Sequence, residues 1–180
     1  MGSRRSPRLR KHAPARVRGR ARRIVTLRDR EAGVLRRRAR AVRAVDRNIR
    51  ALIADMIRSM RRARGVGLAA PQIGVPLRVV VAEVGRGPIA VVNPRLRRRE
   101  GREVGVEGCL SIPGVYGEVS RAQRIEVEGR SPSGRRVVVR SRGLLARVFQ
   151  HEVDHLNGVL FIDPGRLIRR VRFHRRRRGR

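Results

Sequence analysis

Residues 143–158 read GLLARVFQHEVDHLNG, and this stretch organises the rest of the chain. Its apolar residues recur at spacings of three and four, which predicts a helix over about 143–156. Asn157 and Gly158 then supply a left-handed stop. The apolar positions of the predicted helix are Leu144, Leu145, Val148, Phe149 and Leu156.

Two histidines on this helix indicate a metal site. His151 and His155 are four residues apart, so both imidazoles lie on one face and can meet one ion. Glu152 follows the first of them, where it can take a proton from a water whose pKa a divalent ion has lowered. The alternative is a pair of structural histidines on a half-buried helix, and the Glu between them favours the metal site.

A hydrolytic metal site needs a third protein ligand and one open position. Downstream of the helix, the candidates are Asp163 and His174. Upstream stands Cys109, in the segment EGCLSIPG (107–114). A thiolate beside a metal is deprotonated outright, and flanking glycine lets the backbone come close. This setting favours Cys109 as a ligand over an inert buried thiol.

A second amphipathic helix is predicted over about 45–62, with Asp46 near its start, where an acid suits the helix dipole. Met56 and Met60 on its apolar stripe are interpreted as core residues. The segment GVGLAAPQIG (65–74) follows as a shaped loop rich in glycine. The full stripe is Val45, Ile49, Leu52, Ile53, Met56, Ile57 and Met60.

Strands are expected between the two helices. Ile24–Leu27 is expected to be a short strand or edge segment, and the turn Ser131–Gly134 indicates a hairpin between its neighbours. This order predicts one α+β domain, with mixed or antiparallel sheets packed around the metal-binding helix. The other predicted strands are 77–84, 88–93, 122–128 and 135–141.

Basic residues concentrate at both ends of the chain. The sequence has 47 Lys and Arg against 14 Asp and Glu, for a net charge of +33. Residues 1–23 and 164–180 contain no acid, which predicts a disordered N-terminal arm and a basic C-terminal tail around a catalytic domain at 24–163. Such tails attract RNA, although almost exclusive use of Arg is also expected from a compositional bias. Aromatics are too few for base stacking, so nucleic-acid recognition is not expected as the main function.

The single cysteine, Cys109, excludes an intramolecular disulfide and favours a reducing compartment. No apolar run approaches the roughly 20 residues that span a bilayer, so no membrane partner is expected. The bacterial cytoplasm is the favoured location, and an organelle is the lesser alternative.

Three segments carry a resemblance to a known family. GVGLAAPQ (65–72), EGCLS (107–111) and HEVDH (151–155), in this order, closely resemble the signature motifs of the peptide deformylases. The resemblance spans residues 24–163. It implies a metal-dependent hydrolase that removes the N-terminal formyl group from formylmethionine of nascent polypeptides. Formate would be released by attack of metal-bound water or hydroxide.

The resemblance also implies roles for individual residues. Glu152 is the implied general acid and base, and Gln72 with the backbone N–H of Leu110 stabilises the oxyanion. The implied metal is Fe²⁺, with Zn²⁺, Ni²⁺ or Co²⁺ as substitutes in purified protein, and the donor set itself does not choose among them. The implied metal ligands are Cys109, His151 and His155. The implied substrate pocket consists of Val66, Gly67, Gly108, Leu144 and Val148.

Other residues follow from this comparison. Glu107 is expected to orient the loop and the ligands, and Asp154 to point away from the metal as a surface or helix-pairing residue. The stretch 31–35 lacks the family's usual proline, so a looser loop is expected there. Residues 164–180 stand where some members carry a helix that docks on ribosomes. Leu167, Ile168 and Val171 are candidate helical anchors, and association with the ribosome or its rRNA through the basic tails is a hypothesis.

Two rival functions remain open at this point. A metallopeptidase that cuts internal bonds would use the same helix, but it would need a later His or Glu ligand. An RNA-binding protein on a degenerate enzyme fold would not need to keep the full set of candidate catalytic residues.

Overall fold

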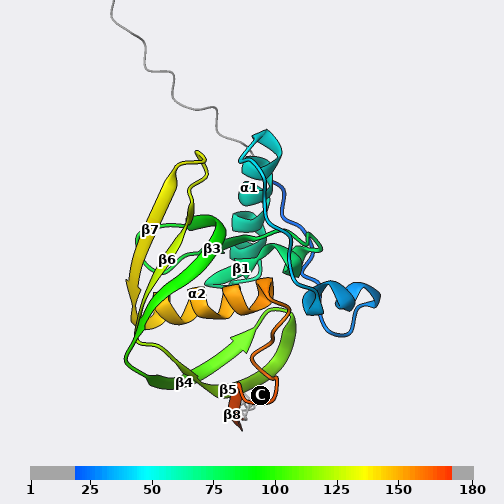
Figure 1. Cartoon of the computed structure of the whole chain (residues 1–180). Coiled ribbons are helices and arrows are strands. Elements are labelled where there is room, and N and C mark those ends of the chain that lie inside the picture. The colour runs from blue at the N-terminus through cyan, green and yellow to red at the C-terminus, as the bar shows by residue number, and fades with distance from the viewer. Residues whose placement is uncertain (1–18, 172–180) are drawn as a thin grey trace, which may run out of the picture.

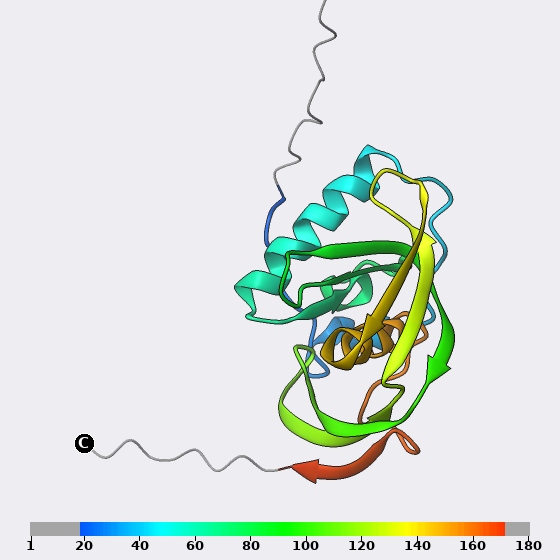
Figure 2. The same cartoon turned by 90° about the vertical axis from the view of Figure 1, so that its left-hand side faces the viewer.

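The predicted HEVDH helix, α2 (Gly143–Leu156), lies between two antiparallel sheets at the centre of the molecule (Figures 1 and 2). The computed structural model describes residues 19–171. One sheet has five strands in the order β1-β2-β3-β6-β7, and the other has three in the order β4-β5-β8. The predicted α+β class and the antiparallel sheets are confirmed. The left-handed stop lies at Gly158, with φ of +75°.

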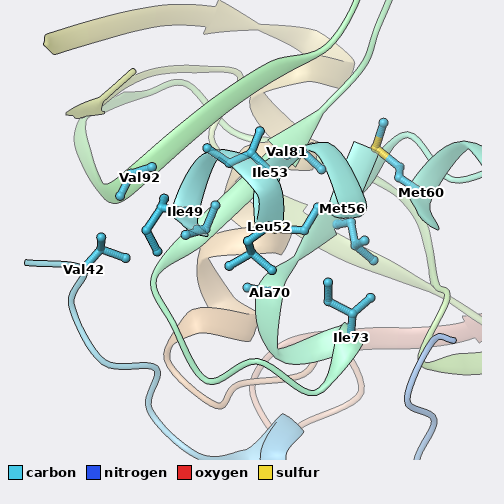
Figure 3. Packing of buried hydrophobic residues seen from close by; sticks show 12 residues of the cluster. Val42, Ile49, Leu52, Ile53, Met56, Met60, Ala70, Ile73, Val81 and Val92 are labelled. Atoms are coloured by element: carbon cyan, nitrogen blue, oxygen red, sulfur yellow. The ribbon is translucent and has the colours of Figure 1, made fainter. Parts of the chain in front are cut away.

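Helix α1 (Arg47–Arg62) covers one face of the five-stranded sheet. It begins where the Asp46 carboxylate accepts a hydrogen bond from the Ile49 N–H, which satisfies one free donor of the first turn. Its apolar stripe is buried as the spacing predicts. Figure 3 shows Leu52 and Met56 beside the loop that follows the helix, in one core cluster with Val81 of the sheet.

The five-stranded sheet fills the space between α1 and α2. In β2, Val79 and Val81 pack with the α1 cluster, whereas Val80 and Ala82 pack with the α2 cluster. Burial on both faces explains why this strand is continuously apolar. The predicted strands match except that β3 extends seven residues further, and the hairpin of β6 and β7 is confirmed. β1 was not predicted: it lies in the segment 65–74 that was expected to be a loop, and it pairs with β2. The strands are β1 (Gly67–Ala69), β2 (Val79–Ala82), β3 (Ile89–Glu100), β6 (Arg124–Arg130) and β7 (Arg136–Arg142).

The three-stranded sheet was not predicted. It consists of β4 (Glu103–Cys109), β5 (Ile112–Arg121) and β8 (Leu167–Val171). The expectation of helical anchors in the last segment is wrong, because β8 pairs antiparallel with β5 and satisfies its backbone groups there. Residues 172–180 of the predicted basic tail lie outside the described residues.

Two expectations for the N-terminal part need correction. Residues 24–27 do not form a strand. Instead, the Val25 N–H donates to the Gln72 carbonyl at 2.8 Å and ties this segment to the loop after α1. The stretch 31–35 is not loose: it lies in a 3₁₀ helix, η1 (Arg30–Arg36), and buries Leu35 completely.

Part of the predicted basic arm packs against the domain. The Arg20 N–H donates to the Asp55 carboxylate at 2.6 Å, and the Arg22 N–H donates to the Ser59 hydroxyl at 2.8 Å. Residues 1–18 of the arm lie outside the described residues. Over the described part of the chain, no helix has the length and apolar character needed to cross a membrane.

The α1 core generates a stability prediction. Met56 is fully buried, so Met56→Ala leaves a cavity and lowers the free energy of unfolding by about 2 to 5 kcal/mol in urea denaturation. Ile168→Ala, at a side chain that is 54% exposed, serves as the control and changes this value by less than about 0.5 kcal/mol. Equal losses in the two variants would contradict the assigned core.

Candidate active site

Three candidate ligands from distant parts of the chain converge in the structure. Cys109 ends β4, where a register shift next to Gly108 interrupts the pairing with β5, and the two histidines lie on α2. The ligand atoms of Cys109, His151 and His155 all lie within 4.8 Å of one another. Cys109 Sγ is 3.2 Å from His155 Nε2.

The downstream alternative Asp163 does not join this cluster. The Asp163 carboxylate accepts hydrogen bonds from Arg36 Nη1 at 2.7 and 2.8 Å and from the Leu160 N–H at 2.8 Å. The Asp163 carboxylate therefore holds the turn after α2 against Arg36 of η1. His174 lies outside the described residues.

The donor set fits a divalent transition-metal ion. A thiolate and two imidazoles are ligands that zinc and iron both accept. His151 uses Nδ1 for a hydrogen bond to Glu107, so Nε2 is the ring atom that can bind an ion. Burial lowers the pKa of His155 well below its usual value and favours the neutral ring that a ligand must be. Burial also acts to lower the pKa of His151, but its hydrogen bonds with Cys109 and Glu107 outweigh burial and raise that pKa.

Glu107 holds His151 in place. Its carboxylate accepts two hydrogen bonds from Arg121 at 2.9 Å, one from Arg147 at 3.0 Å and one from His151 Nδ1 at 2.9 Å. Burial acts to raise its pKa, but Arg121 and His151 outweigh burial and hold the pKa of Glu107 well below its usual range. The ionised carboxylate therefore fixes the His151 tautomer, as expected for a residue that orients a ligand.

Two buried arginines complete this network, and neither was predicted. Arg121 of β5 joins Glu107 to Asp154, so the expectation that Asp154 lies at the surface is wrong. Arg147 also donates to the carbonyl oxygens of Glu103, Gly105 and Val119, and thereby ties α2 to β4 and β5. Arg147 lies one helical turn before His151, and that spacing is the one sequence signal that could have found it.

Glu152 lies on α2 beside the ligands. Its side chain is buried, and Oε2 has no hydrogen-bond partner among the described residues. Burial raises the pKa of Glu152 to about 7. A carboxyl with a pKa near neutrality can both accept and return a proton at working pH.

Gln72 directs its amide toward the cluster. In η2 (Ala70–Ile73), its Oε1 accepts a hydrogen bond from the Ala69 N–H at 2.8 Å, which sets the orientation of the amide. Nε2 then lies 3.5 Å from Cys109 Sγ and 3.3 Å from the Ser111 hydroxyl. A neutral donor fixed in this way suits a developing negative charge.

A cleft of about 430 Å³ opens beside the cluster, lined by both Leu110 and Glu152. At Gly67, an added Cβ would lie 2.4 Å from Glu152 Oε1 and 2.6 Å from Val148 Cγ1, so a larger residue would displace the carboxylate from its place beside β1. Tyr116 and Val115 of β5 also line the cleft, and sequence reasoning missed them because β5 itself was missed. The expected pocket residues Val66, Gly67, Gly108, Leu144 and Val148 all line it.

The comparisons with known proteins agree with one another. A family model described as polypeptide deformylase matches residues 21–171. A peptide deformylase of Pelotomaculum thermopropionicum is 48% identical over 148 residues, which cover 82% of this chain and 94% of the relative.

Solved structures give the same result. The crystal structure of peptide deformylase from Thermotoga maritima superposes with a TM-score of 0.76 at 45% identity, over 82% of this chain and 97% of that chain. A peptide deformylase from Synechococcus elongatus, solved in complex with actinonin, gives a TM-score of 0.74 at 43% identity. That match covers 80% of this chain and 77% of the other.

The buried network predicts a large stability loss when one partner is removed. Arg121→Met leaves the buried Glu107 and Asp154 carboxylates without this positive partner. We therefore expect the free energy of unfolding in urea to fall by about 3 to 5 kcal/mol. The matched control is Arg124→Met, which breaks the exposed pair with Glu100 and changes the value by less than about 1 kcal/mol. Similar midpoints for the two variants would show that the buried network does not hold the domain together.

Proposed function

Since the chain belongs to the polypeptide deformylase family, metal-dependent enzymes that hydrolyse the N-terminal formyl group of nascent polypeptides, we propose that Cys109, His151 and His155 hold its divalent ion. The observation that carries this proposal is the approach of their ligand atoms to within 4.8 Å of one another. The cleft with Glu152 and Gln72 on its wall supports it further.

The chemistry follows from the positions of the side chains. When bound, the ion acts as a Lewis acid that lowers the pKa of a water and polarises the formyl carbonyl. Glu152 accepts the proton of the attacking water and returns it to the leaving peptide nitrogen, so that formate and a free amine result. Its burial and its unpartnered Oε2 suit this exchange.

Gln72 and Leu110 are proposed to stabilise the charge that develops on the formyl oxygen. Nε2 of Gln72 and the backbone N–H of Leu110 are both donors at the cleft wall. Donors that are fixed before reaction favour the transition state over the ground state. The Gln72 amide meets this condition because Ala69 already holds its oxygen.

The pocket residues are proposed to hold the substrate chain. Val66, Leu144 and Val148 offer apolar surface for a methionine side chain. The small residues Gly67 and Gly108 let the substrate backbone approach the cluster closely.

We also propose Fe²⁺ as the native metal, with Zn²⁺, Ni²⁺ or Co²⁺ as substitutes in purified protein. The thiolate and imidazole donors accept all four ions, so the choice rests on the motif resemblance. Elemental analysis of protein purified without air is the direct measurement.

The bacterial cytoplasm is the proposed location, because the relatives reported above are bacterial. The proposed ribosome association through the basic tails concerns segments mostly outside the described residues.

The catalytic roles make separable predictions. Formate release from a formyl-Met tripeptide is expected for the purified enzyme. Glu152→Gln keeps the bound metal but lowers turnover by about 10²- to 10⁴-fold, because the proton acceptor is lost. Glu126→Gln, a change of the same kind at a half-buried residue of β6 that does not line the cleft, serves as the control and leaves turnover unchanged. Full activity in Glu152→Gln would overturn its assigned role.

The ligand roles make a different prediction. Cys109→Ala removes the thiolate donor, so the purified variant is expected to hold much less than one metal ion per chain in elemental analysis. Ser111→Ala, two residues away, is the control and retains the metal. A Cys109→Ala protein with a full metal content would contradict the proposed ligand set.

A further inference from the structure

Strands β3, β6 and β7 present a second chemical surface on the side of the five-stranded sheet opposite α2, beyond the part of that side that α1 covers at β1, β2 and the start of β3. Side chains alternate along β6 and β7, so that Ile125 and Val127 point into the α2 cluster. Their neighbours in sequence, including Arg124 and Glu126, point the other way. These side chains form the outer face together with those of Arg95, Arg97, Arg98 and Glu100 in β3.

Arginines dominate the outer face. Five of them share three glutamates, because Glu126 pairs with Arg98 and Arg140, Glu128 pairs with Arg97 and Arg136, and Glu100 pairs with Arg124. Three further arginines, Arg95, Arg130 and Arg142, have no carboxylate partner within residues 19–171. Eight arginines against three glutamates leave a surplus of five positive charges on one face.

The ion pairs also organise this charge. A glutamate that lies between two arginines neutralises only one of them, so the shared pairs leave positive charge on the face. Alternate residues of a strand are about 6.6 Å apart, so the arginines form rows along neighbouring strands. Their side chains stay largely exposed and can reach a ligand.

The chemistry of the face points to a phosphate backbone. Guanidinium groups bind phosphate with two parallel hydrogen bonds, and a surface of one sign gathers polyanions through counterion release. Strands β3, β6 and β7 carry no aromatic residue, so they offer no platform for stacking bases. Val138 is the exposed large apolar residue here, and one valine is little for insertion into a lipid surface.

We propose that the outer face binds the phosphate backbone of RNA without sequence preference. The choice of RNA rests on the proposed function, since nascent chains emerge from an RNA-rich particle. The residues that line the catalytic cleft come from the loop after α1, from η2, β1, β4, β5 and α2, and none comes from the outer face. RNA bound on this face therefore leaves the cleft open to substrate.

The test compares two variants of the full-length protein with equal charge. The first replaces Arg95, Arg130 and Arg142 with Gln. The matched control replaces Arg47, Arg58 and Arg62 with Gln, which are exposed residues of α1 without an ion pair in the described chain. Both lower the net charge by three from +33. Binding to a fluorescent RNA hairpin is measured by anisotropy over a series of salt concentrations.

We expect the outer-face variant to reduce the slope of log K against log salt by about 2 to 3, at roughly 0.7 to 0.9 per lost phosphate contact. The α1 variant is expected to change the slope by less than half as much. A third variant with Lys at the three outer-face positions keeps the charge and is expected to retain most of the slope. Urea denaturation of each variant ensures that folded proteins are compared.

Three outcomes would overturn the proposal. An equal reduction of the salt slope in the two Gln variants would show that only net charge matters for RNA binding. An unchanged slope in the outer-face variant would show that RNA does not contact this face. Stronger binding to anionic lipid vesicles than to RNA, lost in the outer-face variant, would assign the face to a membrane. Formate release from the tripeptide is measured in parallel and stays unchanged in every variant, so a failure of the proposed function is seen separately.

Discussion

The carboxylate of Glu107 is the constraint on which the rest of the molecule depends. It is buried between the three-stranded sheet and α2, and it accepts four hydrogen bonds from Arg121, Arg147 and His151. An ionised carboxylate is stable there only because positive partners surround it. Since two of its partners lie on α2 and one on β5, satisfying this single charge sets the position of the helix against the sheet. The same contact sets the orientation of a candidate ligand.

Helix α2 explains how one element serves both packing and chemistry. Every residue from Ala146 to Leu156 is buried, because a sheet lies on each side of the helix. Phe149 and Leu156 face the five-stranded sheet and provide apolar burial. His151 and Asp154 face the three-stranded sheet, where Glu107 and Arg121 are their partners. Glu152 lies beside Gly67 of β1, with one oxygen that has no partner among the described residues, and it stands at the wall of the cleft.

The sequence predicted the elements whose pattern is local. Helix α2 and the i, i+4 histidines could be foreseen because their periodicity lies within one short segment. Strands β4 and β5 could not be foreseen, because their residues are partly exposed and do not alternate regularly between apolar and polar. Part of each strand lines the cleft, which forms only in the folded chain. β8 depends on pairing with β5, and the burial of Arg121 depends on Glu107, 14 residues away. Such long-range partners leave no local signal.

The separation of the candidate ligands along the chain has a further consequence. Cys109 and His155 are 46 positions apart in the sequence, and they lie side by side without a covalent cross-link between β4 and α2. With an ion held between them as proposed, the site acts as a reversible cross-link that closes this long loop. An ion that binds the native state and not the unfolded state raises the free energy of unfolding, and this gain grows with the logarithm of the free metal concentration. With the ligand set as proposed, loss of the ion would shorten the lifetime of the folded protein as well as silence it.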